Sequence, residues 1–293
     1  MSVDSLPKIS IVTPSFNQGE FIEETIKSVI GQGYGNLEYV VIDGGSKDNS
    51  VEIIRRYEKH LHYWVSEEDS GHGHALNKGF EKTTGEIMAW INSDDKYTPW
   101  AFNTVAEIFT LFPHVEWIVG INAWFNKNGS MIRAKREPKN IYDFLIGNGG
   151  WVQQESVFWR RNLWDKAGGY ISQNYKFMVD GELWTRFFLH ADLYSVESIL
   201  GGYRSHASNR AGLNWQQCLS EMEFAIKSMK NDCTKDVIDN FKKLFILKWI
   251  NKHLFFGQKF LPKMTNRFHE YAKYKNINYK NEQWQERKLK FYY

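Results

Sequence analysis

The chain has 293 residues, of which 42% are hydrophobic and 24% are charged, a balance that excludes a mainly disordered protein. Its two cysteines, Cys218 and Cys233, are too few for a disulfide framework, and no Cys-x-x-Cys pair indicates a zinc site. No apolar run approaches the ~20 residues of a membrane span, and the initial MSVDSLPK lacks a charged-then-apolar signal segment. We therefore expect a reduced, cytoplasmic protein.

Charge is distributed unevenly along the chain. From Thr234 to the end there are 14 Lys and Arg against 5 Asp and Glu, whereas the preceding part holds 23 against 29. The basic part is also rich in aromatic residues, as in Leu244 to Lys263 (LFILKWINKHLFFGQKFLPK). It suits either peripheral contact with the inner face of the plasma membrane or a helical hairpin packed on the domain. Nucleic-acid binding is not expected, because Gly-rich and RNP-like signatures are absent.

The first hundred residues alternate predicted strands and helices. Short apolar runs predict buried strands at Ile9–Thr13, Leu37–Ile42, His62–Val65 and Ile87–Ile91. Apolar residues at helical spacing predict helices over 21–30, 51–57 and 75–82, and a further helix between Thr98 and Pro113. This order predicts an α/β fold with a mostly parallel central sheet and helices on both faces.

Polar residues follow each predicted strand at the point where the strand ends. These loops are Pro14-Ser15-Phe16-Asn17, Asp43-Gly44-Gly45-Ser46, Glu67-Glu68-Asp69 and Ser93-Asp94-Asp95. Ligands of open parallel sheets bind outside the carboxyl ends of the strands, so we expect these carboxylates to converge. Their repulsion is costly unless a cation or polar ligand compensates it, and adjacent aspartates predict Mg²⁺ or Mn²⁺. The alternative, that an aspartate caps the following helix, is the one we favour for Asp48.

Several motifs occur in the order typical of one enzyme family. They are PKISIVTPSFNQ, VVIDGGSKDNS, EEDSGHGHALNKG, TTGEIMAWINSDD, WVQQESVFWRRNLWDKAGGY and VDGELWTRF. Together they resemble family-two glycosyltransferases, which have the GT-A fold, and the resemblance covers about Lys8 to Arg210. It implies a catalytic domain over residues 1–211. The region over 212–293 lies beyond the resemblance, and its basic, aromatic composition predicts helices.

The resemblance also implies a donor site. The nucleotide base, commonly uracil, would be held by Pro14, Ser15, Phe16, Asn17 and Asp43. Asp69, Asn77 and Lys78 would lie along the donor. Asp94 would face the ribose or the metal, and Asp95 would bind the metal directly. Arg204, His206 and Arg210 lie in a segment that closes over the diphosphate in the family.

Other positions match the acceptor side of the family. Asp180 stands where relatives keep the catalytic base, although a helix N-cap would also explain it. Gln154 and Glu155 match a loop that approaches the sugar. Trp184, one turn after Asp180, would project the same way unless it packs in the core. Trp151 follows a glycine-rich stretch and would either cover an acceptor sugar or pack.

One motif departs from the family pattern. Where relatives commonly carry Asp before Ala-x-Asn-Lys-Gly, this chain has His74, with His72 two residues earlier. Three roles stay open for this pair: contact with the donor sugar or its phosphates, no special role, or a His-x-His zinc pair. The zinc pair lacks a third ligand nearby in the sequence.

These features predict an inverting glycosyltransferase that moves a sugar from a nucleotide-diphosphate donor, expected to be a UDP-sugar, to a saccharide or lipid-linked acceptor. A divalent ion would stabilise the leaving diphosphate while Asp180 accepts the acceptor proton in a single displacement. A role in surface polysaccharide biosynthesis rests on the resemblance. The rivals are an inactive sugar-nucleotide binding module, a non-enzymatic carbohydrate-binding protein, and a dinucleotide oxidoreductase, which would need the GxGxxG that this chain lacks.

Overall fold

The computed structural model describes residues 6–147, 152–207, 209, 213–253 and 270–290. The first half contains β1 (Ile9–Ser15), α1 (Ile22–Ile30), β2 (Leu37–Asp43), α2 (Ser50–Arg56), η2 (Glu58–His60), β3 (Tyr63–Ser66), α3 (His72–Phe80), β4 (Ile87–Trp90), β5 (Lys96–Tyr97), α4 (Ala101–Leu111), β6 (Trp117–Val119), β7 (Asn122–Phe125), β8 (Met131–Lys135) and α5 (Ile141–Ile146). The second half contains η3 (Gln154–Ser156), β9 (Val157–Arg160), α6 (Arg161–Lys166), α7 (Val179–Phe188), β10 (Leu193–Val196), β11 (Gly201–Arg204), α9 (Trp215–Asp232), α10 (Lys235–His253), η4 (Glu270–Ala272), β12 (Tyr274–Lys280) and β13 (Gln283–Leu289).

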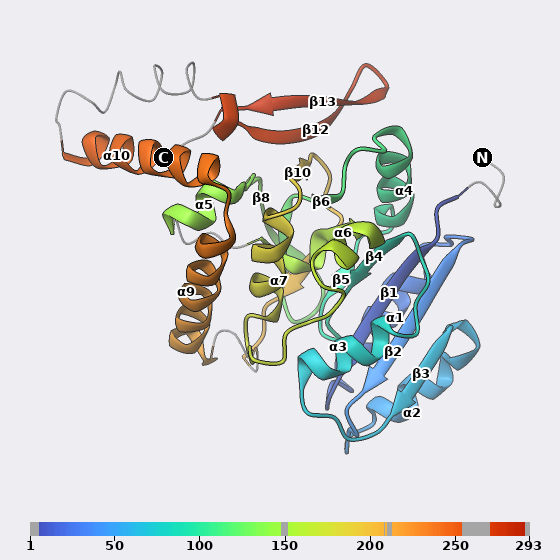
Figure 1. Ribbon diagram of the computed structural model, residues 1–293. Helices are drawn as coiled ribbons and strands as arrows, with labels where there is room; N and C mark the ends of the chain where they lie inside the picture. The colour runs from blue at the N-terminus through green and yellow to red at the C-terminus, as the bar shows by residue number, and fades with distance from the viewer. Residues whose placement is uncertain (1–5, 148–151, 208, 210–212, 254–269, 291–293) are drawn as a thin grey trace.

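Nine of the described strands form one sheet in the order β13-β12-β10-β6-β9-β4-β1-β2-β3. β1 pairs in parallel with β2 and β4, and β2 with β3, as expected for strands joined by helical crossovers. β9 runs antiparallel to both β4 and β6. The predicted α/β fold with a mostly parallel sheet is therefore confirmed, and helices flank the sheet (Figure 1).

The parallel strands lie in the core. All residues of β1 are buried, as are those of β2 after Leu37, which is the pattern of strands covered on both faces. Gly79 allows α3 to lie close to β1, because a Cβ there would come within 2.3 Å of Val12 Cγ1. This packing fixes the loops that follow β1, β2, β3 and β4 along one edge of the sheet.

A smaller sheet of four described strands, in the order β5-β11-β7-β8, lies beside the end of β4. β11 pairs antiparallel with β5 and parallel with β7. Since β5 directly follows the Ser93–Asp95 loop, this pairing brings the end of β11, at Arg204, next to the two adjacent aspartates.

The C-terminal region packs onto the rest of the molecule through several elements. α9 lies alongside α7, α10 runs past α5, and β12 pairs in parallel with β10, which extends the central sheet (Figure 1). The helices were predicted, whereas the β12–β13 hairpin was not. Cys218, Met222 and Ile277 belong to the same apolar cluster as the central strands. Within the described part of the chain, none of the helices combines the length and apolarity needed to cross a membrane.

Candidate active site

A cavity of about 530 Å³ lies at the edge of the sheet where the parallel strands end. Its walls come from the loops after β1, β2, β3 and β4, from α3, from β11, and from the segment before α7. The lining residues are Pro14, Ser15, Phe16, Gln18, Gly44, Asp69, Gly71, His72, Ala75, Asn92, Ser93, Asp94, Asp95, Lys176, Phe177 and Tyr203. The expected convergence of polar loops is therefore observed.

Two residues predicted to hold the nucleotide base instead support the loops around it. The fully buried Asp43 carboxylate accepts hydrogen bonds from Ser66 Oγ at 2.7 Å, from Ser46 Oγ at 2.5 Å and from the backbone N–H groups of Ser46 and Gly45. Asn17 accepts a hydrogen bond from Lys47 N at 2.8 Å. Neither lines the cavity, so Asp43 and Asn17 support the loops at its wall without facing it.

Of the three residues predicted to lie along the donor, Asp69 is at the cavity, whereas Asn77 and Lys78 are not. Asp69 lines the cavity, and its Oδ1 accepts a hydrogen bond from Gly71 N at 2.7 Å. Asn77 points elsewhere, because its amide makes two hydrogen bonds to the backbone of Ile171. Lys78 forms an ion pair with Glu67. The assignment of Asn77 and Lys78 to the donor is therefore wrong for this structure, since both side chains bind protein groups away from the cavity.

The two histidines of the same motif separate. His72, at the start of α3, lines the cavity. His74 does not, and its Nδ1 accepts a hydrogen bond from Ser70 N at 3.1 Å. His72 is thus the histidine placed to contact a ligand, and among the described residues the two histidines do not belong to a group of three or more potential metal ligands.

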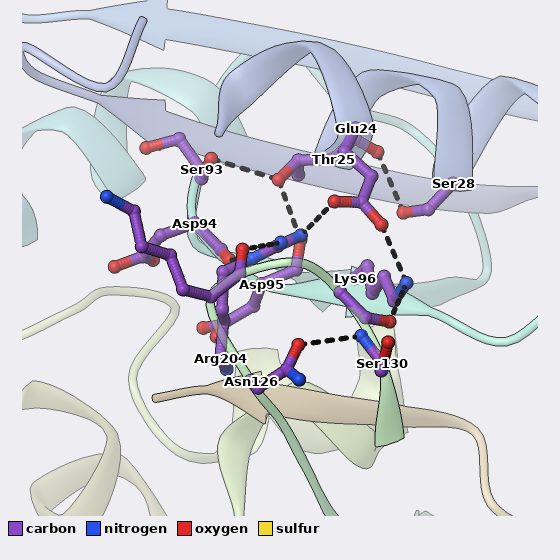
Figure 2. Close-up of polar contacts among 12 residues, drawn as sticks. Glu24, Thr25, Ser28, Ser93, Asp94, Asp95, Lys96, Asn126, Ser130 and Arg204 are labelled. Carbon is purple, nitrogen blue, oxygen red and sulfur yellow. Dashed lines mark hydrogen bonds and ion pairs between the residues drawn. The ribbon is translucent and has the colours of Figure 1, made fainter. Parts of the chain in front are cut away.

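The loop that carries the adjacent aspartates is held by α1 and β11 (Figure 2). Thr25 Oγ1, on α1, lies 2.9 Å from the carbonyl oxygen of Ser93 and 2.7 Å from that of Asp95. The backbone N–H of Arg204 donates to Asp95 Oδ1 at 2.7 Å. These contacts fix the loop from elements far apart in the sequence.

Arg204 supports this loop. The sequence instead predicts that it faces the diphosphate. Its guanidinium is 1% exposed and donates to the carbonyl oxygens of Asp94 and Lys127 and to Glu24 Oε2. Figure 2 shows this group among α1 and the loop. Because its N–H groups are directed at protein oxygens and it does not line the cavity, the diphosphate assignment is wrong for Arg204.

Asp95 and Glu155 form a buried pair of carboxyl groups. Burial, with Glu155 and Asp94 adding repulsion, raises the pKa of Asp95 well above its usual range. Burial likewise raises the pKa of Glu155 to about 7, and the charges of Asp180 and Asp94 act in the same direction. Gln154, predicted to approach the sugar, is buried and donates to the carbonyl oxygen of Trp90 at 2.6 Å. It therefore braces the end of β4 and does not line the cavity.

Asp94 meets a histidine from the other side of the site. Its Oδ2 lies 3.1 Å from Nε2 of His206, whose ring stacks on Phe21 at 4.5 Å between centroids. In the described residues, no group of three or more His, Cys, Asp or Glu side chains is arranged to hold a metal ion. Asp94 and His206 are two potential ligands that lie together, and Asp95 is next to them in the loop.

Asp180 lies in the first turn of α7, three residues after the cavity-lining Phe177, and is not itself among the lining residues. Burial raises the pKa of Asp180 from its ordinary 3.8 to about 6, and the nearby charge of Glu221 adds to the rise. The N-cap residue of α7 is Met178, two residues before Asp180. The N-cap explanation of this aspartate therefore fails, and the carboxyl group is suited to accept a proton near neutral pH.

Three remaining candidate residues lie outside the cavity or outside the described residues. Trp184 has no exposed surface and stacks on Trp90 with ring centroids 5.6 Å apart. The prediction that it contacts the acceptor is wrong, because its helical spacing from Asp180 is also the spacing of the buried face of α7. Trp151 and Arg210 lie outside the described residues.

Sequence reasoning missed several lining residues, among them Gln18, Lys176, Phe177 and Tyr203. Gln18 directly follows the predicted loop. Tyr203 is adjacent to the YRSHASNR segment, and its position could have been inferred from it. Lys176 and Phe177 belong to a turn with no recognisable pattern, and only their position before Asp180 could have indicated them.

The fold and this acidic cavity define a protein of the GT-A type, with a ligand site at the carboxyl ends of parallel strands. Residues 10–183 match the family described as Glycosyl transferase family 2, and the chain belongs to this family. TuaG of Bacillus subtilis strain 168, whose name proposes a role in teichuronic acid biosynthesis, is 37% identical over 94 residues. This match covers 31% of the present chain and 37% of TuaG.

Solved structures show the same fold. The first 349 residues of Staphylococcus aureus TarS, in complex with UDP-GlcNAc, superpose with a TM-score of 0.65 at 16% identity, over 90% of this chain and 79% of that one. The mannosyltransferase PcManGT from Pyrobaculum calidifontis, in complex with GDP-Man and Mn²⁺, gives a TM-score of 0.57 at 20% identity, over 80% and 66% of the two chains.

Proposed function

We propose that this glycosyltransferase transfers a sugar from a UDP-sugar to a hydroxyl of a saccharide or lipid-linked acceptor, with inversion, during assembly of a surface polysaccharide. The observation that carries the proposal is the cavity itself, because it joins a nucleotide-sized space to three carboxyl groups. Within the described residues, the buried Ser15 Oγ and Asn92 Oδ1 lack hydrogen-bond partners and both residues line the cavity. Buried polar atoms without partners are unfavourable, so a polar ligand would satisfy them.

Asp180 would act as the base. Its carboxylate accepts the proton of the acceptor hydroxyl while the acceptor oxygen forms a bond to the anomeric carbon. The bond from that carbon to the diphosphate oxygen breaks, and its electron pair leaves with the nucleoside diphosphate. A pKa of about 6 keeps Asp180 ionised at neutral pH yet basic enough to take the proton.

The residues present suit a divalent cation. Asp94 Oδ2 and His206 Nε2 lie 3.1 Å apart and come from opposite sides of the site. Asp94 and His206 would hold the ion, with Asp95 beside them, and the ion would stabilise negative charge on the leaving diphosphate. The complex of PcManGT with Mn²⁺ supports this choice of metal.

Asp180→Asn tests the base. Release of UDP from UDP-GlcNAc, with water and with simple saccharides as acceptors, should fall by about 10²–10⁴-fold. Donor affinity measured by calorimetry should stay within a small factor of the wild-type value. Asp165→Asn, at an exposed position of α6, is the matched control. Equal losses of affinity and turnover would remove the base assignment, and a wild-type protein that binds donors without any turnover would favour an inactive binding module.

Donor and metal are tested together. We expect UDP-sugars to raise the melting temperature more than GDP- or dTDP-sugars do, and Mn²⁺ or Mg²⁺ to increase this effect. Asp94→Ala should abolish the increase caused by the metal while leaving the metal-free effect of UDP. A metal response that survives Asp94→Ala would refute its role as a ligand.

We further propose that α10 contacts an anionic membrane surface from the cytoplasmic side. Phe245, Ile246 and Trp249 are 51%, 56% and 56% exposed, and the exposed Lys242 and Lys243 precede them. Apolar side chains beside lysines suit an interfacial helix. Phe245→Ser should reduce flotation with phosphatidylglycerol vesicles, whereas Leu111→Ser on α4 should not. Flotation that is independent of both vesicle charge and Phe245 would refute this contact.

A further inference from the structure

Glu221, on α9, holds the segment that precedes α7. Its carboxylate oxygens accept hydrogen bonds from the backbone N–H groups of Lys176, Phe177 and Met178, at 3.0, 2.9 and 2.8 Å. These N–H groups stand at the start of α7, where the side chain of the N-cap residue, Met178, makes no capping hydrogen bond. A carboxylate near a helix N-terminus is favourable, so one glutamate both ties three amides and stabilises the start of α7.

The same two helices approach closely at the next residues. A Cβ at Gly181 would lie 2.2 Å from Met222 Sδ, so the absence of a side chain there leaves room for Met222 between α7 and α9. Tyr175 packs on Phe224 with ring centroids 6.2 Å apart. The contacts of Glu221 are therefore part of a continuous interface between α9 and residues 175–181.

This segment contributes to the candidate site in two ways, through the wall of the cavity and through Asp180. Lys176 and Phe177 line the cavity, and Asp180 follows them. Asp180, Lys176 and Phe177 are thus fixed relative to the donor loops by a helix that lies outside the family match over residues 10–183. The described contacts of Glu221 in this interface are all to backbone amides, so it does not touch the reacting groups.

We propose that Glu221 is a positioning residue for catalysis, which sets the place of Asp180 and of the Lys176–Phe177 wall. This inference rests on the proposed role of Asp180 as the base. It gives the C-terminal region a part in the reaction, because α9 supplies the carboxylate that orders the catalytic turn.

Glu221 also acts on Asp180 through its charge. The titratable groups whose charges interact with Asp180 are Glu155 beside Asp95, and Cys218 and Glu221 on α9. Removal of the negative charge of Glu221 lowers the pKa of Asp180. The acidic limb of turnover, where the base becomes protonated, should then move to lower pH.

The first test needs no turnover. In hydrogen–deuterium exchange of the full chain, the amides of Lys176, Phe177 and Met178 should be protected in the wild type. In Glu221→Ala they should exchange about tenfold faster or more, the factor expected for loss of a charge-assisted hydrogen bond. Trypsin should also cleave after Lys176 more readily. Glu223→Gln, at an exposed position of the same helix, should change neither result. Unprotected amides in the wild type would overturn the proposal.

The second test separates positioning from folding. Glu221→Gln keeps an accepting oxygen but removes the charge. The rate of UDP release from UDP-GlcNAc should therefore fall less in Glu221→Gln than in Glu221→Ala. The acidic limb of its pH profile should lie at lower pH. Glu221→Ala should lower kcat by about 10- to 100-fold, as small misplacements of catalytic groups do, with little change in KM. Unchanged kcat and pH profile in both variants would refute the proposal, provided that Asp180→Asn is inactive. An active Asp180→Asn would instead refute the proposed function.

Discussion

Replacement of Asp180 by asparagine should stabilise the protein at neutral pH. The two side chains have nearly the same shape, so the change mainly removes a negative charge. The pKa of Asp180 is raised from 3.8 to about 6 because the carboxyl group is buried. A rise of about 2 pKa units corresponds to about 3 kcal/mol of free energy that disfavours the ionised form in the folded protein. Since the side chain retains some exposure, this value is an upper limit.

The sign follows from proton linkage. Because the pKa of this group is higher in the folded than in the unfolded protein, the folded state holds the proton more tightly. Its stabilising contribution is complete below pH 3.8 and is lost as the pH rises through about 6. Asparagine does not titrate. The stability of Asp180→Asn relative to wild type should therefore increase between pH 4 and pH 8, by at most about 3 kcal/mol.

Urea denaturation of both proteins at pH 4 and pH 8 measures this difference. Other carboxyl groups titrate in both proteins, so their contributions largely cancel. Asp165→Asn, exposed on α6, should show the same difference from wild type at both pH values. If the advantage of Asp180→Asn is equal at pH 4 and pH 8, the carboxyl group is not destabilised by burial, and the reason for a base poised near neutral pH disappears.

Other substitutions test the supports of the site and the core. Arg204→Met should cost about 2–3 kcal/mol by urea denaturation, because the part-buried carbonyl oxygens of Asp94 and Lys127 lose their donors and Glu24 loses its ion pair; a change below 0.5 kcal/mol would contradict this role. Trp184→Ala should cost about 3–5 kcal/mol, as expected for a large buried side chain, and an unchanged denaturation midpoint would contradict its place in the core. Ile277→Ala should cost about 2–5 kcal/mol if β12 is integral to the sheet, and a protein equally stable without this side chain would show that the hairpin is peripheral.

The central strands could be predicted because their burial leaves a clear mark in the sequence. β1, β2 and β4 are short apolar runs followed by polar loops, and helical spacing marks the crossovers between them. The rule that ligands bind at the carboxyl ends of such strands then located the cavity. The β12–β13 hairpin left no such mark, because β13 is almost entirely polar and partly or fully exposed. Only its long-range pairing, from β12 to β10, reveals it.

Individual side chains were harder to place than the loops that carry them. The resemblance predicts that Arg204 lies near the diphosphate, but the sequence does not show that Glu24, 180 residues away, accepts from it. Asn77 is likewise occupied by the backbone of Ile171, 94 residues further along. Polar side chains near a site satisfy whichever partner folding provides, and that partner is not encoded in local spacing.

The contacts of α9 bear on where the catalytic unit ends. A boundary after residue 211 follows the motifs of the family, and it stays a prediction. Yet the buried face of α9, with Cys218, Met222 and Met229, packs in the same apolar cluster as α7, and β12 joins the edge of the central sheet. Glu221 binds the turn before Asp180. The part of the chain on which the site depends therefore extends beyond the part that resembles the family in sequence. The motifs identify the groups proposed to react, whereas a residue beyond the matched region binds the turn that precedes one of those groups.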